Sequence, residues 1–144
     1  MANIRQSILI REDLRLPIGL LSAQVAHIHM EAIRTILNDP KNYSNNQDSI
    51  CEINFSAKGS YGYDLQEWLK APYVYVHKVP GLEVLREFQS CFRAKKIPVY
   101  EWQDTVIINI SDTQKKAFNL LVGIAIGPCD SDKIKGIISD LPLL

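Results

Sequence analysis

Three polar side chains of this 144-residue chain, Gln24, His27 and Asp104, are of types that together can activate water for hydrolysis. An imidazole or a carboxylate can take a proton from water, and a side-chain amide can orient that water by hydrogen bonding. Gln24 and His27 are three residues apart, so a helix places them on one face. The alternative is structural, with both side chains satisfying hydrogen bonds on a half-buried helix face.

The helix that must carry Gln24 and His27 is predicted over residues 19–37. Its apolar stripe has helical spacing and consists of Leu21, Val25, Ile28 and Ala32. A second, mostly polar face lies beside this stripe and consists of Leu20, Gln24, His27 and Glu31. The helix follows a β-branched strand at residues 7–11 and ends at Asp39-Pro40, because proline cannot continue a helix. In α/β sheets, ligands bind at the carboxyl ends of strands, where such helices begin.

The rest of the chain alternates between strand and helix patterns. Strands are predicted at residues 73–79, 97–102, 106–110 and 120–126, and helices at about 64–69, 82–95 and 130–138. We predict a turn at Gln103-Asp104 between two strands. This turn would put Asp104 at a strand end, near the crevice where the helix at residues 19–37 begins. Gly127-Pro128 is expected to end the last strand, and Asp130 or Ser131 to cap the last helix.

Such alternation predicts an α/β protein. We expect a three-layer α/β/α sandwich with a mixed, mostly parallel sheet of about four strands. The antiparallel part would come from a hairpin around Asp104. The chain is read as a single domain, residues 1–144, with a polar insertion at about residues 38–63 that forms a long surface loop, mobile or functional.

Composition narrows the function classes. Hydrophobic residues make up 47% of the chain, which is too many for a mainly disordered protein. Sixteen basic residues balance sixteen acidic ones, which disfavours a strongly basic nucleic-acid-binding domain. The three cysteines form no CxxC pair, so no zinc or thioredoxin-type site is indicated. No apolar run approaches the roughly 20 residues that span a bilayer, so we expect a cytoplasmic protein without membrane contact.

The N-terminal part carries a recognisable pattern. A strand leads into R-E-D-L at residues 11–14, then a glycine at Gly19 and S-A-Q-V-A-H at residues 22–27. This pattern resembles the opening signature of the type 2 peptidyl-tRNA hydrolases. The similarity continues in P-Y-V-Y-V-H-K-V at residues 72–79, in Gln103-Asp104 and in L-V-G-I-A-I-G-P at residues 121–128. It covers nearly the whole chain outside the polar insertion.

The resemblance implies a function. Members of this family cleave the ester that joins a nascent peptide to the tRNA 3′ ribose, without a metal or organic cofactor, and often as homodimers. Peptidyl-tRNA and a second copy of the chain are therefore the partners to test. By resemblance, the catalytic positions are Gln24, His27 and Asp104. The substrate-binding positions are Arg11, Asp13, Gly19 and Asn109.

The chain also departs from the family pattern. Ile18 and Leu20 stand where the family has two lysines in a G-K-G-K loop, and Ile107 and Ile108 where it has arginine and threonine. Fewer cations mean fewer phosphate contacts. The alternative function is therefore a catalytically inactive member that binds a protein or a small apolar ligand in the same crevice. A third is a small hydrolase that uses His27 and Asp104 on a neutral substrate, and the fold does not decide among them.

Overall fold

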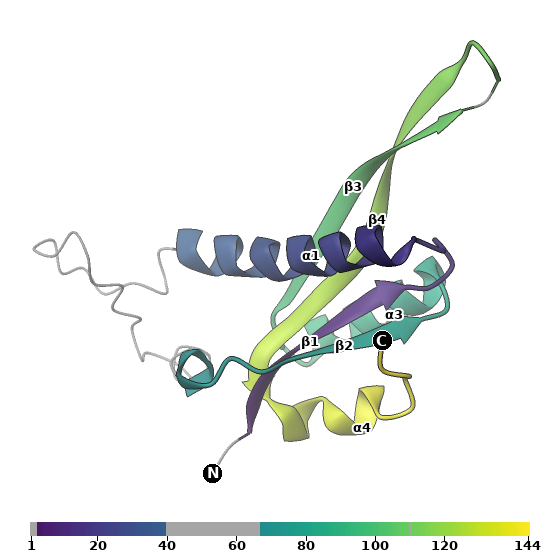
Figure 1. The fold of residues 1–144 in the computed structure, drawn as a ribbon. Helices are drawn as coiled ribbons and strands as arrows, with labels where there is room; N and C mark the ends of the chain where they lie inside the picture. The colour runs from purple at the N-terminus through teal and green to yellow at the C-terminus, as the bar shows by residue number, and fades with distance from the viewer. Residues whose placement is uncertain (1–2, 40–66, 110) are drawn as a thin grey trace, which may run out of the picture.

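The computed structural model describes residues 3–39, 67–109 and 111–144 (Figure 1). In chain order the elements are β1 (Ile4–Arg11), α1 (Ile18–Asn38), β2 (Val74–Val79), α3 (Leu82–Ala94), β3 (Val99–Asn109), β4 (Lys115–Asp130), the 3-10 helix η2 (Ser131–Lys133) and α4 (Lys135–Ile138). Residues 67–70 add one helical turn. The predicted polar insertion lies outside the described residues from position 40 onward. No helix among the described residues is long and apolar enough to cross a membrane.

The strands form one mixed sheet in the order β2-β1-β4-β3. β1 and β2 are parallel, whereas β4 is antiparallel to both β1 and β3. A mixed four-stranded sheet is thus confirmed, but the expectation that it is mostly parallel was wrong. The reason is the short connection from β3 to β4, because strands joined by a hairpin must run antiparallel. β4 also pairs with β1 in the antiparallel direction.

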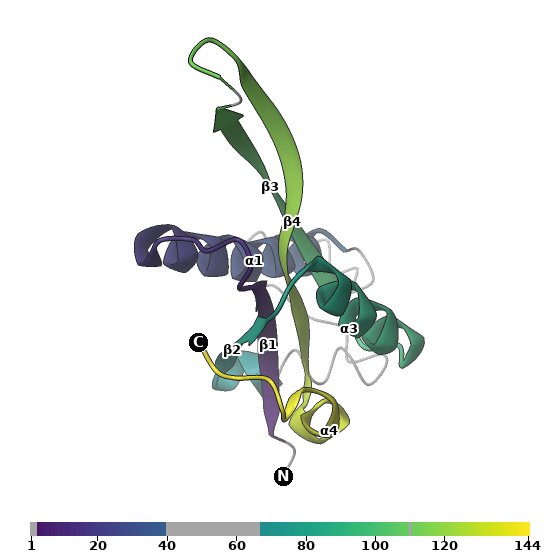
Figure 2. The same ribbon diagram turned by 90° about the vertical axis from the view of Figure 1, so that its right-hand side faces the viewer.

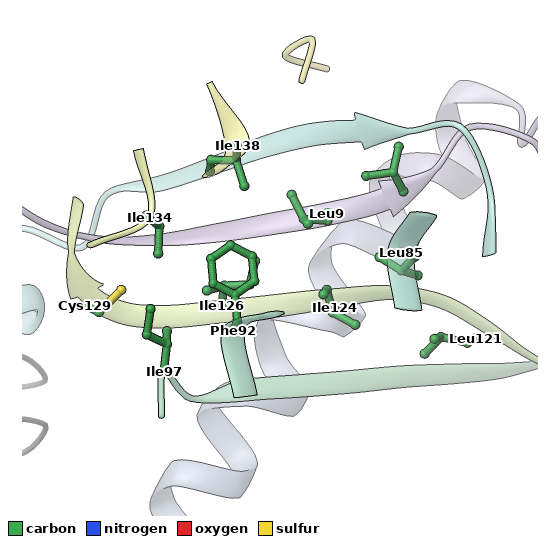
Figure 3. Packing of buried hydrophobic residues seen from close by; sticks show 11 residues of the cluster. Leu9, Leu85, Phe92, Ile97, Leu121, Ile124, Ile126, Cys129, Ile134 and Ile138 are labelled. Atoms are coloured by element: carbon green, nitrogen blue, oxygen red, sulfur yellow. The ribbon is translucent and has the colours of Figure 1, made fainter. Parts of the chain in front are cut away.

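Helices cover both faces of the sheet, which confirms the three layers. α1 lies on one face, and α3 and α4 lie on the other (Figure 2). Successive residues of β1 point to opposite faces, so Ile8 packs beneath α1 while Leu9 faces α3. Figure 3 shows Phe92 of α3 among Leu9, Ile124 and Ile126, all of them fully buried.

The predicted turn at Gln103-Asp104 does not exist. β3 continues through this point, and the pairing with β4 merely shifts register between Trp102 and Gln103, as at a β-bulge. Neither Gln103 nor Asp104 is a glycine or proline, the residues most typical of turns. Residues 105–108 are all β-branched, which favours a strand. Asp104 therefore lies within a strand. The antiparallel hairpin is the one formed by β3 and β4, not one around Asp104.

The predicted break at Gly127-Pro128 is also wrong. β4 runs on to Asp130, and Cys129 pairs with Arg5 of β1. Gly127 adopts a φ of +83°, which glycine reaches without the steric cost of a Cβ atom, and its N–H donates to the carbonyl of Pro98 at 3.0 Å. The predicted cap is present, since the Asp130 carboxylate accepts a hydrogen bond from the N–H of Asp132.

β3 and β4 extend beyond the rest of the sheet as a two-stranded arm (Figures 1 and 2). The pairing of β1 with β4 ends at Ile10 and Gly123. From Leu121 back to Lys115, β4 is paired with β3. β4 accordingly begins at Lys115, five residues before the strand predicted at residues 120–126.

Gly123 sets how closely α1 approaches the sheet. A Cβ atom at this position would lie 2.6 Å from both Ile28 Cδ1 and the carbonyl oxygen of Leu9. We expect Gly123→Ala to lower the free energy of unfolding by about 1–3 kcal/mol, the usual cost of overpacking. Urea denaturation measures this change. Gly136→Ala is the matched control, because a Cβ there meets nothing within 4 Å. Equal stability of the two variants would contradict the close contact.

Candidate functional site

Gln24 of α1 and Asp104 of β3 meet in the folded chain. The Gln24 amide donates through Nε2 to Asp104 Oδ2 at 2.6 Å, and its Oε1 accepts from Trp102 Nε1 at 2.9 Å. Gln24 is only 8% exposed. A donor contact and an acceptor contact on the same amide fix which end faces Asp104. The side chain is therefore held in one orientation at the junction of α1 and β3.

Trp102 is the residue of this cluster that the sequence prediction missed. Its indole stacks on the His27 ring, with ring centres 5.0 Å apart and planes inclined by 16°. Trp102 and Asp104 are two residues apart on β3, a spacing that puts side chains on one face of a strand. This signal was hidden because a turn was predicted between them. We name the four residues Gln24, His27, Trp102 and Asp104 the Gln24 cluster.

The Asp104 carboxylate is held from two sides. Oδ2 accepts from Gln24, and Oδ1 accepts from the backbone N–H of Thr105 at 2.7 Å. Each carboxylate oxygen has two lone pairs, so both oxygens keep capacity for a water molecule. The carboxylate is half-buried and can act as a positioned proton acceptor. His27 is exposed, and the described residues give its ring nitrogens no hydrogen-bond partner.

Arg11 and Asp13 form a two-point ion pair after the end of β1. Arg11 Nε and Nη2 donate to the two oxygens of Asp13 at 3.0 and 2.7 Å. The remaining nitrogen, Nη1, donates to the carbonyl of Leu121 at 3.0 Å. Hydrogen bonding to Arg11 holds the pKa of Asp13 below its ordinary value, opposed by partial burial and supported by charge attraction. The pair fixes the chain that leads from β1 towards α1.

A cavity of about 330 Å³ lies at the carboxyl ends of β1 and β2, the edge at which α/β proteins bind ligands. We name it the Arg11 cavity, and its lining residues are Ile10, Arg11, Glu12, Arg15, Leu16, Leu21, Lys78 and Leu144. Three of these carry a positive charge and one a negative charge. Leu21 of the lining precedes Gln24 by about one helical turn. Arg11 donates to the carbonyl of Leu121, whose β3 partner, Gln103, lies between Trp102 and Asp104, so the lining reaches both elements that carry the Gln24 cluster.

The remaining residues that the sequence singled out lie at the start of α1 and near the far end of the β3–β4 arm. Ile18 and Leu20 point into solvent at the start of α1, 83% and 54% exposed. No atom lies within 4 Å of where a Cβ of Gly19 would be. Asn109 pairs with Lys115 near the far end of the arm, about 16 Å along the strand from Asp104 at some 3.3 Å per residue. The structure does not bring Asn109 to the Gln24 cluster, and its side chain lies outside the described residues.

A metal site is not indicated by the described part of the chain. Its His, Cys, Asp and Glu side chains form no group of three or more that could hold a metal ion. The chemistry that the described site offers is that of a carboxylate, an amide and an imidazole acting on water.

Comparison with known proteins gives one finding. A family model described as Peptidyl-tRNA hydrolase PTH2 matches residues 4–144 of the chain. A search of curated proteins returns no match. The matched residues include the whole described sheet and all four members of the Gln24 cluster.

The Arg11–Asp13 pair predicts a pH effect. We expect Arg11→Gln to raise the pKa of Asp13 towards its ordinary value, as measured by NMR titration of the carboxyl carbon. A carboxyl with a lower pKa in the folded state adds stability above its unfolded-state pKa and loses it as the pH falls through the folded-state pKa. The pH-dependent part of the stability difference between wild type and variant should therefore shrink in acid.

The control for this titration is Arg34→Gln, which removes the Arg34–Glu31 ion pair on α1. It should raise the pKa of Glu31, now held down by its hydrogen bond with Arg34, and leave that of Asp13 in place. An unchanged Asp13 titration in Arg11→Gln would refute the pairing.

Proposed function

Because this chain belongs to the type 2 peptidyl-tRNA hydrolase family, whose model matches residues 4–144, we propose that it hydrolyses the ester between a peptide and the 3′ ribose of tRNA. One observation carries the proposal: the Gln24 amide is fixed by hydrogen bonds to Asp104 and Trp102. A purely structural role for Gln24 needs only satisfied hydrogen bonds. In the proposed reaction, the lone pairs that Asp104 keeps accept a proton from water.

The reaction needs a proton acceptor, an oriented water and a proton donor. Water attacks the ester carbonyl carbon while Asp104 takes one of its protons. The tetrahedral intermediate then collapses, the bond to the ribose oxygen breaks, and that oxygen receives a proton. Gln24 Nε2 has two hydrogens, of which Asp104 accepts one. The second hydrogen is free to orient the water or to stabilise the oxyanion.

His27 is the proposed proton donor to the leaving ribose oxygen. Its exposed ring is held flat against Trp102, which limits its motion and keeps it beside Gln24. An imidazole ring nitrogen can carry the proton that this step transfers. Trp102 acts as a positioning residue, because it orients both the Gln24 amide and the His27 ring.

Binding of tRNA is supported by charge next to the Gln24 cluster. Arg11, Arg15 and Lys78 line the Arg11 cavity, and Glu12 is the one acidic side chain among the described lining residues. Lys78 Nζ lies 3.5 Å from Glu12, which is a loose contact, and Arg11 is committed to Asp13. Arg15 and Lys78 are therefore the cations we propose for phosphate contacts, in place of the two lysines of the family loop.

A second candidate function rests on the start of α1. Ile18 and Leu20 expose apolar side chains to water there. Exposed apolar surface is typical of places that bind another molecule. This favours an inactive family member that binds a protein or a small apolar ligand. The two functions differ in one measurable property, which is turnover of peptidyl-tRNA.

Release of peptide from purified peptidyl-tRNA tests catalysis. We expect Asp104→Asn to lower kcat by about 100-fold or more, the usual contribution of a general base, and His27→Ala to lower it in the same range. Trp102→Phe keeps a ring for His27 but loses the hydrogen bond to Gln24, so a smaller loss is expected. Asp112→Asn, in the exposed loop between β3 and β4, is the charge-matched control. Wild-type turnover no faster than buffer would support the inactive alternative.

Charge restored at the start of α1 tests the role of the missing lysines. We expect Ile18→Lys with Leu20→Lys to tighten tRNA binding and to steepen its salt dependence, by about 0.7–0.9 in the log–log slope for each additional phosphate that the protein neutralises. Both side chains are exposed, so the change costs little packing. Met30→Lys, at a 59% exposed position further along α1, is the control. Equal binding by the double variant and the control would contradict this explanation.

A further inference from the structure

A second cavity, of about 200 Å³, lies on the face of the sheet opposite to α1, between β1, β2 and the η2–α4 segment. We name it the Ser7 pocket, and its lining residues are Arg5, Ser7, His77, Ser131, Ile134, Lys135, Ile138 and Ser139. The residues of the Gln24 cluster do not line it. At this volume it is smaller than the roughly 300–1,000 Å³ of pockets for drug-sized ligands, so a small ligand fits best.

The lining of the pocket includes several hydrogen-bond donors and two cationic side chains. Its lining includes a guanidinium, an ammonium group, an imidazole and three hydroxyls, and none of the described lining residues is an aspartate or glutamate. No ion pair links Arg5 or Lys135 to a carboxylate within the described residues. The nearby carboxylate of Asp130 already accepts from the backbone N–H of Asp132. Within the described residues, neither cation of the lining is therefore held in an ion pair.

Two buried donors in this pocket have no acceptor. Ser7 is fully buried, and its Oγ has no hydrogen-bond partner. The Nε of Arg5 is likewise buried and without a partner. Buried polar side-chain atoms are nearly always hydrogen-bonded, so two unsatisfied donors at one cavity indicate a missing acceptor. A group with several acceptor oxygens would satisfy both at once.

The donors are held in place by the strands. Arg5 and Ser7 are alternate residues of β1 and so share a face of the sheet. Ser7 is aligned with Tyr75 of β2, and the Arg5 guanidinium lies over the Tyr75 ring, 4.6 Å from its centre. His77, two residues further along β2, has its Nδ1 3.3 Å from the carbonyl of Leu141. These contacts preorganise the wall of the pocket.

We propose that the Ser7 pocket binds a phosphate group, either as free phosphate or as the phosphoryl end of a small phosphorylated molecule. Near neutral pH a phosphate carries up to two negative charges and several acceptor oxygens, which match the two cations Arg5 and Lys135 and the free donor of Ser7. The two apolar lining residues, Ile134 and Ile138, exclude water and strengthen these contacts. This site is independent of the proposed hydrolysis of peptidyl-tRNA.

Titration of the whole chain with inorganic phosphate tests the proposal. Calorimetry at constant ionic strength, adjusted with sodium chloride, should show saturable binding. Ser7→Ala should weaken binding about 10-fold or more, since a hydrogen bond to a charged group is lost. The same variant should unfold at an equal or higher temperature without phosphate, because an unpaired buried hydroxyl has been removed.

Lys135→Gln gives a second test that does not disturb the core, since Lys135 is exposed. It should weaken phosphate binding several-fold, whereas Lys95→Gln, an equal charge change at the end of α3, should not. Tighter binding of glycerol phosphate than of inorganic phosphate would identify a phosphorylated molecule as the ligand, and equal binding would identify free phosphate. No saturable binding by wild type, or wild-type affinity in both Ser7→Ala and Lys135→Gln, would overturn the proposal.

Discussion

The close approach of α1 to the sheet is the constraint on which the rest of the structure depends. Gly123 of β4 leaves room for Ile28 of α1 directly against the backbone of β1. At this depth Gln24, one turn before Ile28, reaches Asp104 and Trp102 of β3. A larger residue in the middle of β4 would lift the helix away from these partners. Packing of the core and geometry of the Gln24 cluster thus have a common origin.

Local charge matters more in this protein than its total. The chain has equal numbers of acidic and basic residues, which on its own argues against an RNA substrate. In the folded chain, Glu101 lies within ion-pair distance of both Arg86 and Arg93 beside α3. Other cations remain unbalanced in the Arg11 cavity and in the Ser7 pocket. A neutral total is therefore compatible with a local excess of basic side chains at each of these two cavities.

The amino-acid pattern was sufficient for much of the fold. Helical spacing of apolar residues correctly placed α1, and Asp39-Pro40 follows its end. The strands predicted from β-branched runs, at residues 7–11 and 73–79, overlap β1 and β2, and their first residues differ by three and by one. These elements are set by local preference and by burial of one face, which short stretches of sequence carry. The family motifs, spread over nearly the whole chain, indicated the family that the model match then showed.

The sequence by itself determined the α/β class, the α1 face that carries Gln24 and His27, and the family. Tertiary structure alone decided that β4 lies between β1 and β3, that β3 passes Asp104 without a turn, and that Trp102 joins the Gln24 cluster. It alone placed Ser7, whose hydroxyl has no hydrogen-bond partner, at a cavity. The physical reason is that strand order, register and bulges depend on pairing between distant segments. No local pattern around Asp104 or Ser7 contains that information.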